Sequence, residues 1–307
     1  MSNISHKNLY LLSFINPNDA TLKKIDYAFL SYLFFSTFLM AFAIDASVHI
    51  LPLILIRILI LPIVFLLIYY EKRTLNPVLL LMRYAYPLIL SGYFYSETVH
   101  YNKFLFSNID PLLIRVDEAL FGMQPSLVFS EHFPGHLFSE LMYFGYFSFY
   151  ILLAGFAIYV FVKKRDSFKR LMFELTFSMY VFYLLFSIIP SEGPQFYFSY
   201  PENVVPGGYL FASAVHFVQK MAEQPTGAFP SSHVGISVII LILSRKYIPH
   251  FFHVIWPVVI ILIFSTVYIK AHYAVDVIGG LVLAPLILIL SGLIYRIPDG
   301  WNKTGST

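Results

Sequence analysis

The chain has 307 residues, of which 58 % are hydrophobic and only 12 % are charged. Soluble domains carry roughly 45–50 % apolar and about 25 % charged residues. This composition, with a mean hydropathy of +0.73, therefore excludes an ordinary soluble globule and a disordered chain. The net charge of +3 is small, and its basic residues fall in short loops, which indicates membrane orientation rather than nucleic-acid binding. The chain has no cysteine, which excludes disulfides, thiolate nucleophiles and cysteine-bound metals.

Long apolar segments predict membrane-spanning helices. A crossing needs about 20 apolar residues, and lipid admits only helices or closed barrels as spanning elements. The sequence therefore predicts an all-α fold, a polytopic transmembrane helical bundle of about eight spans. The expected spans are residues 27–44, 48–70, 77–95, 137–162, 171–189, 231–244, 251–269 and 274–295. The sixth span is short and could begin in a re-entrant turn.

Polar stretches divide the chain into five regions. A polar N-terminal segment is followed by N-terminal transmembrane helices, an outer loop with an expected interfacial helix, a catalytic transmembrane region and a short tail. Their bounds are 1–26, 27–95, 96–136, 137–296 and 297–307. A second polar loop, 190–230, is rich in proline and glycine, which is typical of a structured loop.

The distribution of lysine and arginine predicts the orientation in the membrane. If the amino terminus is cytoplasmic, fourteen of these residues lie on the inner side and four on the outer side. Cytoplasmic loops carry an excess of lysine and arginine. We therefore expect both termini to be cytoplasmic and the loops 96–136 and 190–230 to lie on the non-cytoplasmic side.

Three polar segments fall at this outer face, namely 189–195, 227–233 and 265–276. They are distant in sequence, and their convergence on one rim of the bundle is what a functional site requires. In the second segment, Pro230, Ser231 and Ser232 resemble the start of a helix. Free N–H groups and the helix dipole favour an anion there, and a bound phosphate would also meet the two serine hydroxyls.

The third segment carries residues suited to nucleophilic chemistry. His272 and Asp276 are four residues apart, so on a helix they would share one face. A carboxylate in that position can orient an imidazole and stabilise its cationic form. Lys270 adds a positive charge, and His233 supplies a second imidazole. This combination predicts phosphoryl transfer through a histidine nucleophile.

The motifs resemble those of a known enzyme superfamily. Pro-Ser-Ser-His at 230–233 and His-Tyr-Ala-Val-Asp at 272–276 are similar to the second and third signature motifs of the type 2 phosphatidic acid phosphatase superfamily. The resemblance covers roughly residues 110–295. Two sequence patterns are closer to the inositol phosphorylceramide synthase branch, the aureobasidin-resistance type. They are Ser-Glu-Gly-Pro at 191–194 and Asp117 followed by Leu120-Phe121-Gly122 and Pro125.

The resemblance implies a six-helix lipid phosphatase-type core and a role for each motif residue. His272 is the nucleophile that forms a phosphohistidine, and Asp276 orients it. His233 is the general acid for the leaving oxygen and later activates water or an acceptor hydroxyl. The superfamily needs no metal, and we expect neither a metal site nor a cofactor.

The substrate phosphate is expected to be bound by Lys270, Ser231, Ser232, Gly193 and Gln195. The sequence departs from the superfamily pattern at two cationic positions. The first motif is absent, with the uncharged Gln195 in its place, and Thr266 stands where an arginine is usual. Lys270 is the nearest replacement for the missing charge.

These observations predict an integral membrane lipid phosphatase or phosphotransferase with its active site at the non-cytoplasmic face. Its expected partners are the bilayer, a membrane lipid phosphate substrate and an alcohol acceptor such as inositol, with no nucleic acid. Two alternatives stay open. One is an inositol phosphorylceramide synthase-like head-group transferase, and the other is a catalytically decayed transporter or scaffold. Transport is disfavoured because few charged residues lie in or near the spans, with no paired half-helices.

Overall fold

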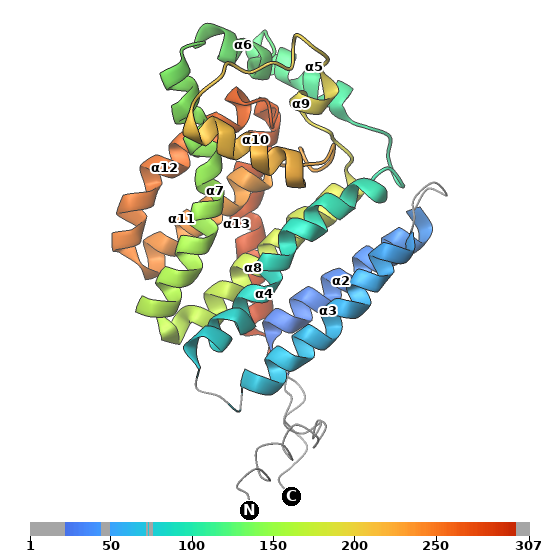
Figure 1. The fold of residues 1–307 in the computed structure, drawn as a ribbon, viewed down its shortest axis with the longest axis vertical. Helices are drawn as coiled ribbons and strands as arrows, with labels where there is room; N and C mark the ends of the chain where they lie inside the picture. Colours follow the sequence, from blue (N-terminus) through green and yellow to red (C-terminus); the bar gives the residue numbers. More distant parts are fainter. Residues whose placement is uncertain (1–21, 44–49, 72, 74–75, 299–307) are drawn as a thin grey trace, which may run out of the picture.

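A computed structural model describes residues 22–43, 50–71, 73 and 76–298 (Figure 1). This part of the chain contains helices and no strand, which confirms the all-α prediction. The long helices are α2 (Lys24–Ala43), α3 (Ile50–Glu71), α4 (Pro77–Glu97), α7 (His136–Lys163), α8 (Arg165–Ile188), α11 (Ser232–Tyr247), α12 (Pro249–Tyr268) and α13 (Ala274–Arg296). The expected cytoplasmic location of the termini concerns residues that lie mostly outside the described ranges.

Seven of these helices, all except α11, are long and apolar enough to cross a membrane. The chain is therefore a multi-pass membrane protein. The helix α11 has 16 residues and packs against α7, α8, α12 and α13. Protein rather than lipid surrounds much of it, which is why the hydroxyl-bearing Ser237 and Ser244 are fully buried along its length.

The structure extends one predicted span. The helix α8 begins at Arg165, well before the predicted start at residue 171. Its first turns carry charged residues such as Asp166 and Lys169, so hydropathy detects only the apolar part of a longer helix. The helix α8 contacts α2 and α4 on one side and α7, α11 and α13 on the other. It therefore joins the N-terminal helices to those that carry the polar motifs.

The two polar loops fold into short helices that cover one end of the bundle. They contain η1 (Thr98–His100), α5 (Asp110–Phe121), α6 (Pro125–His132), α9 (Pro194–Tyr197) and α10 (Leu210–Ala222). In Figure 1, α5, α6 and α9 lie at the top of the bundle, with α10 beneath them. The interfacial segment expected in the first loop consists of two helices, because α5 ends at Gly122 in a left-handed conformation with φ of +69°.

Buried ion pairs tie the three N-terminal helices together. The Arg83 guanidinium of α4 binds the Asp26 carboxylate of α2, with Nη1 and Oδ1 2.6 Å apart. Its Nε lies 3.2 Å from the Glu71 carboxylate of α3. Arg57 and Glu97 form a second pair, between α3 and α4. A charge inside a membrane span is costly unless it is paired, so these contacts fix how the three helices pack.

Candidate active site

The fold brings the three polar segments 189–195, 227–233 and 265–276 into direct contact. They belong to the α8–α9 connection, the start of α11 and the α12–α13 connection. Three hydrogen bonds join them pairwise: Phe229 N to Ser191 Oγ (2.6 Å), Ser231 N to Asp276 O (3.0 Å) and Gln195 N to Lys270 O (2.8 Å). The expected convergence of these segments on one rim of the bundle is what the structure shows.

Two glycines allow this close approach. A Cβ atom at Gly280 would lie 2.5 Å from the carbonyl oxygen of Ser231, so only glycine lets α13 pack this closely on the start of α11. Gly193 has a φ of +87°, and its Cβ would lie 2.8 Å from the carbonyl oxygen of Ala271. Gly193 was expected to bind phosphate, but its N–H donates to Asp110 at 2.9 Å. Its role here is therefore to admit the neighbouring loop.

His272 is held by a backbone carbonyl and faces His233. Its Nδ1 lies 2.8 Å from the Ala228 carbonyl oxygen, and its Nε2 lies 3.4 Å from His233 Nδ1. Because a carbonyl only accepts, Nδ1 carries the hydrogen and Nε2 has the free lone pair of the neutral ring. Burial lowers the pKa of His272 to about 4, although the Ala228 hydrogen bond and the charge of Glu223 act in the opposite direction. The ring is thus neutral near pH 7, with a free lone pair on Nε2.

The relation between His272 and Asp276 differs from the prediction. The expectation that they share one face of a helix is wrong, because α13 begins at Ala274 and His272 precedes it. Asp276 lies in the first turn, where its Oδ2 accepts a hydrogen bond from Tyr273 N at 2.8 Å. The same oxygen lies 3.5 Å from His272 Nδ1. The Ala228 carbonyl therefore makes the shorter contact with the imidazole, and Asp276 adds a nearby negative charge while it caps α13.

The helix start predicted from the second motif is present. The helix α11 begins at Ser232, and Ser231 is its N-cap, with Oγ accepting a hydrogen bond from Val234 N at 3.3 Å. The first N–H groups of a helix have no partner within it, so those of Ser232 and His233 are available at this end. The His233 ring is stacked on Tyr146, with centroids 4.7 Å apart. This stacking fixes the plane of the second imidazole.

A carboxylate that the sequence did not single out lies beside the histidine pair. Glu223, just after α10, accepts hydrogen bonds from Tyr146 Oη at 2.6 Å and from Gln195 Nε2 at 2.7 Å. The Gln195 side chain also accepts from Gln219 Nε2 at 2.9 Å. Gln195 was expected to bind the substrate phosphate, and here its amide is bound to a carboxylate. No motif or spacing marks Glu223, so only the fold brings it here.

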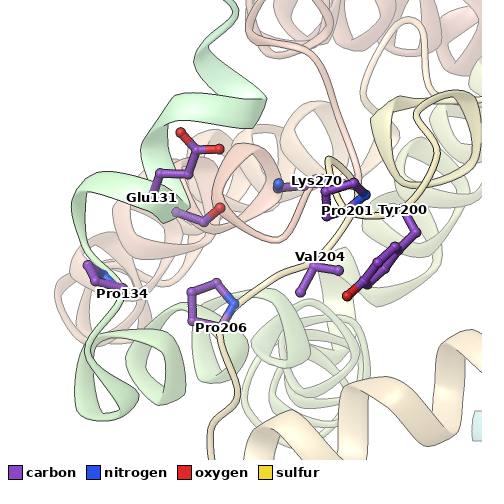
Figure 2. A pocket seen from close by; sticks show the side chains of 8 residues that line it. Glu131, Pro134, Tyr200, Pro201, Val204, Pro206 and Lys270 are labelled. Carbon is purple, nitrogen blue, oxygen red and sulfur yellow. The ribbon is translucent and has the colours of Figure 1, made fainter.

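Lys270 is directed away from the histidine pair. Its ammonium donates to the backbone carbonyl of Glu202, and the residue is only 1 % exposed. It lines a pocket formed with α6 and residues 200–206, and neither histidine contributes to that pocket (Figure 2). Lys270 has a left-handed φ of +62°. Although Lys270 is close to His272 in sequence, its ammonium is bound to the Glu202 carbonyl in a pocket that neither histidine lines.

Two buried carboxylates of α5 hold the connections that carry the site. Asp117 accepts hydrogen bonds from the first two N–H groups of α13, at 2.9 and 2.8 Å. Burial raises the pKa of Asp117, and the two N–H donors counteract this effect. Asp110 accepts from Tyr273 Oη at 2.8 Å and from two N–H groups of the 191–195 loop. Neither aspartate was predicted from the sequence to belong to the site.

Within the described residues, no group of three or more His, Asp or Glu side chains has a geometry that could hold a metal ion. Two further histidines at the same end of the bundle, His132 and His136, each place Nδ1 within 3.0 Å of a backbone carbonyl oxygen. The functional groups gathered at the histidine pair are therefore imidazole, carboxylate, amide, hydroxyl and backbone N–H.

The fold and site define a multi-pass membrane protein in which a buried histidine, His272, faces the half-buried His233 at one end of the bundle. Residues 112–290 match the PAP2 superfamily, and the chain belongs to this superfamily. A PA-phosphatase related-family protein of Dictyostelium discoideum is 24 % identical over 196 residues. The aligned part is 57 % of this chain and 36 % of that relative, so the chain spans well under two thirds of its length. No solved structure matches the chain.

We predict that Asp117→Ala destabilises the protein and lowers any activity of the site. The substitution leaves two backbone N–H groups at the start of α13 without their acceptor, which costs about 1–3 kcal/mol for each buried group. The expected result is a drop in the melting temperature of the detergent-purified protein. Glu118→Ala is the matched control, because Glu118 is the adjacent, exposed carboxylate of α5. Equal melting temperatures for the two variants would contradict the positioning role of Asp117.

Proposed function

We propose that the protein is an integral membrane lipid phosphatase or phosphotransferase that acts on a lipid phosphate or phospho-head-group through a phosphohistidine. The observation that carries this proposal is the neutral, buried His272 whose Nε2 faces His233 Nδ1 at 3.4 Å. Membership of the PAP2 superfamily and the name of the Dictyostelium relative support a phosphatase-type reaction. No metal ion or cofactor takes part in the proposed reaction.

In the first step, His272 Nε2 attacks the phosphorus atom. A P–N bond forms while the P–O bond to the leaving group breaks, and His233 gives a proton to the leaving oxygen. Burial and the nearby His272 lower the pKa of His233, so His233 takes up this proton when the anionic substrate lies beside it. The two ring nitrogens are in contact in the structure, so a phosphoryl group enters only after one imidazole rotates aside. Asp276, whose Oδ2 lies 3.5 Å from His272 Nδ1, stabilises the positive charge that develops on the ring.

In the second step, the phosphoryl group passes from the phosphohistidine to water or to an alcohol. Neutral His233 takes the proton of the attacking hydroxyl, the new P–O bond forms, and the P–N electron pair returns to Nε2. The phosphoryl oxygens are bound at the start of α11, where the Ser231 hydroxyl and the N–H groups of Ser232 and His233 are donors. Gly193 contributes shape rather than a donor, because its N–H is bound to Asp110.

We expect the protein to form a covalent phosphoenzyme that depends on His272. The purified protein would be mixed briefly with ³²P-labelled nitrophenyl phosphate, whose leaving group does not need protonation, and quenched in alkali, which preserves phosphohistidine. Label should be absent from His272→Gln. His233→Gln should retain the label longer than the wild type, because it lacks the base for the second step, which is worth about 10²–10⁴-fold.

His216→Gln is the control for this experiment, because His216 is an exposed histidine of α10 at the same end of the bundle. It should behave like the wild type. Labelling of His272→Gln, or turnover that a chelator abolishes and a divalent ion restores, would exclude the proposed mechanism. Absence of label from every variant and from the wild type would favour the decayed transporter or scaffold.

A second candidate within the same chemistry is an inositol phosphorylceramide synthase-like head-group transferase, in which an alcohol hydroxyl rather than water receives the phospho-group. The polar cluster of Glu223, Gln195 and Gln219 favours it, because carboxylates and amides bind hydroxyl groups. Tyr146 connects this cluster to the histidine pair, because its hydroxyl donates to Glu223 and its ring stacks on His233. Hydrolysis and transfer share the phosphoenzyme and differ only in the acceptor.

We predict that inositol diverts the phospho-group from water to an inositol ester and that Glu223→Gln reduces this diversion. The loss of a charged acceptor for a hydroxyl is expected to lower the ratio of transfer to hydrolysis roughly tenfold, which corresponds to about 1.4 kcal/mol. Products would be separated after reaction of phospholipids of several head groups, with and without inositol. Glu118→Gln is the control. An unchanged yield of inorganic phosphate in the presence of inositol and other alcohols would leave hydrolysis as the reaction.

We also place the site at the non-cytoplasmic face. The support is the fourteen-to-four distribution of lysine and arginine, because all the loops that build the site belong to the side with four. The short connection between α7 and α8, at the opposite end of the bundle, carries the densest basic cluster. A lipid phosphate of the non-cytoplasmic leaflet would then reach the histidine pair directly.

Single cysteines test this orientation, because the natural chain has none. Ser213 lies exposed on α10, and Ser213→Cys should react with a membrane-impermeant maleimide in intact cells. Ser167→Cys, near the α7–α8 connection, should react only after the cells are permeabilised. The reverse pattern would place the histidine pair at the cytoplasmic face and contradict the proposed location.

A further inference from the structure

A pocket on the outer end of the bundle is separate from the histidine pair. It has a volume of about 380 Å³ and lies between α6 and the stretch 200–206 that follows α9. Figure 2 shows Glu131 on α6 on one side of it and Pro201 and Val204 on the other, with Lys270 between them. The catalytic role proposed above uses none of these residues.

Lys270 supplies a buried positive charge to this pocket. The residue is 1 % exposed, and among the described residues its hydrogen-bond acceptor is the backbone carbonyl of Glu202. An ammonium has three donors, so one carbonyl leaves donors for a further acceptor. Ser130 of α6, which is also 1 % exposed, lines the same pocket and carries a hydroxyl.

The charges around Lys270 leave the pocket favourable to an anion. Burial lowers the pKa of Lys270, while the charges of Glu131 and Glu202 raise it. Both glutamates are exposed, so water screens their carboxylates much more than it screens the ammonium. A buried charge is costly without a close partner of opposite sign. An anion that enters the pocket would be such a partner.

The backbone conformation of Lys270 also supports a ligand for its side chain. Its φ of +62° belongs to the left-handed region, which suits glycine and costs another residue on the order of 1 kcal/mol. Lysine at this position places an ammonium in the pocket, which glycine would not. Strain of this kind is a reason to look for a ligand that the side chain binds.

We propose that this pocket is a second anion-binding site, distinct from the histidine pair, which binds a phosphate group through Lys270 and the Ser130 hydroxyl. The group is held and is not chemically changed, since no nucleophile or acid of the reaction centre lines the pocket. It comes either from the head group of a neighbouring lipid or from a soluble phosphate compound. The proposal goes beyond the proposed reaction and does not depend on it.

Binding to the full chain, purified in detergent, tests the proposal without reference to turnover. The background is His272→Gln, which removes the proposed nucleophile. Two probes are used, inorganic [³²P]phosphate and ³²P-labelled dihexanoyl phosphatidic acid below its micellar concentration. At least one probe should bind, and Lys270→Gly should weaken that binding about tenfold or more. Tighter binding of the lipid probe identifies a lipid head group as the source, and equal binding identifies the phosphate group alone.

Matched variants separate loss of the ammonium from loss of the fold. Glycine suits the backbone of residue 270, so Lys270→Gly should melt at or above the temperature of its parent. Lys103→Ala removes another lysine of the outer face, one that is exposed and paired with Glu192, and should leave binding unchanged. Glu131→Gln should tighten binding severalfold, because it removes a repelling charge. Absence of binding by both probes, or equal binding by Lys270→Gly and its parent, would overturn the proposal.

Discussion

The site depends on two buried carboxylates of one short helix outside the membrane spans. Asp110 and Asp117 of α5 accept five hydrogen bonds, from the 191–195 loop, from Tyr273 and from the start of α13. These connections have no regular structure of their own that would fix their backbones. The carboxylates supply the acceptors that these N–H groups, which have no partner within a helix, need. The interfacial helix is thereby part of the site rather than a cover over it.

This support explains how a histidine outside any helix is held in a defined orientation. With the start of α13 fixed by Asp117 and the start of α11 pressed against Gly280, the Ala228 carbonyl lies 2.8 Å from His272 Nδ1. That hydrogen bond selects the tautomer in which Nε2 is free. Asp276, whose Oδ2 lies 3.5 Å from His272 Nδ1, then stabilises positive charge on the ring more than it orients the ring. Hydrogen bonding and charge stabilisation, which a single carboxylate often combines, are here divided between two groups.

Much of this architecture can be predicted from sequence, because its causes are local. Apolar length predicts the seven long spans, and the Pro-Ser-Ser pattern predicts the start of α11 with Ser231 as its cap. The register of His272 and Asp276 was predicted wrongly, since a four-residue spacing does not say where a helix begins. The bond to the Ala228 carbonyl carries no sequence signal, because every residue has a carbonyl. Glu223 was missed for a similar reason: tertiary packing alone brings it to the histidines.

The partners in the buried ion pairs of the N-terminal helices also depend on tertiary packing. Arg57 and Arg83 could be recognised from sequence as charges within spans, but their partners could not be named. The structure pairs them with Glu97 and Asp26, each on another helix. Since unpaired charges in lipid are costly, these pairs specify one packing of α2, α3 and α4. The α8 helix, which contacts α2 and α4, then has a fixed neighbour on the side away from the site.

The charges around the histidine pair differ from the cation-rich arrangement that the resemblance to the superfamily led us to expect. Where a cation was expected, Gln195 is bound to the carboxylate of Glu223. The charged residue nearest in sequence to His272, Lys270, has a left-handed backbone and lines another pocket. In the proposed reaction, the electrostatic stabilisation of a phosphoryl group at His272 then comes from dipoles, namely the N-terminus of α11 and its N–H groups. A helix N-terminus is equivalent to only about half a unit of positive charge. The proposed site therefore suits a singly charged phosphodiester, such as a head-group ester, better than a doubly charged phosphate monoester.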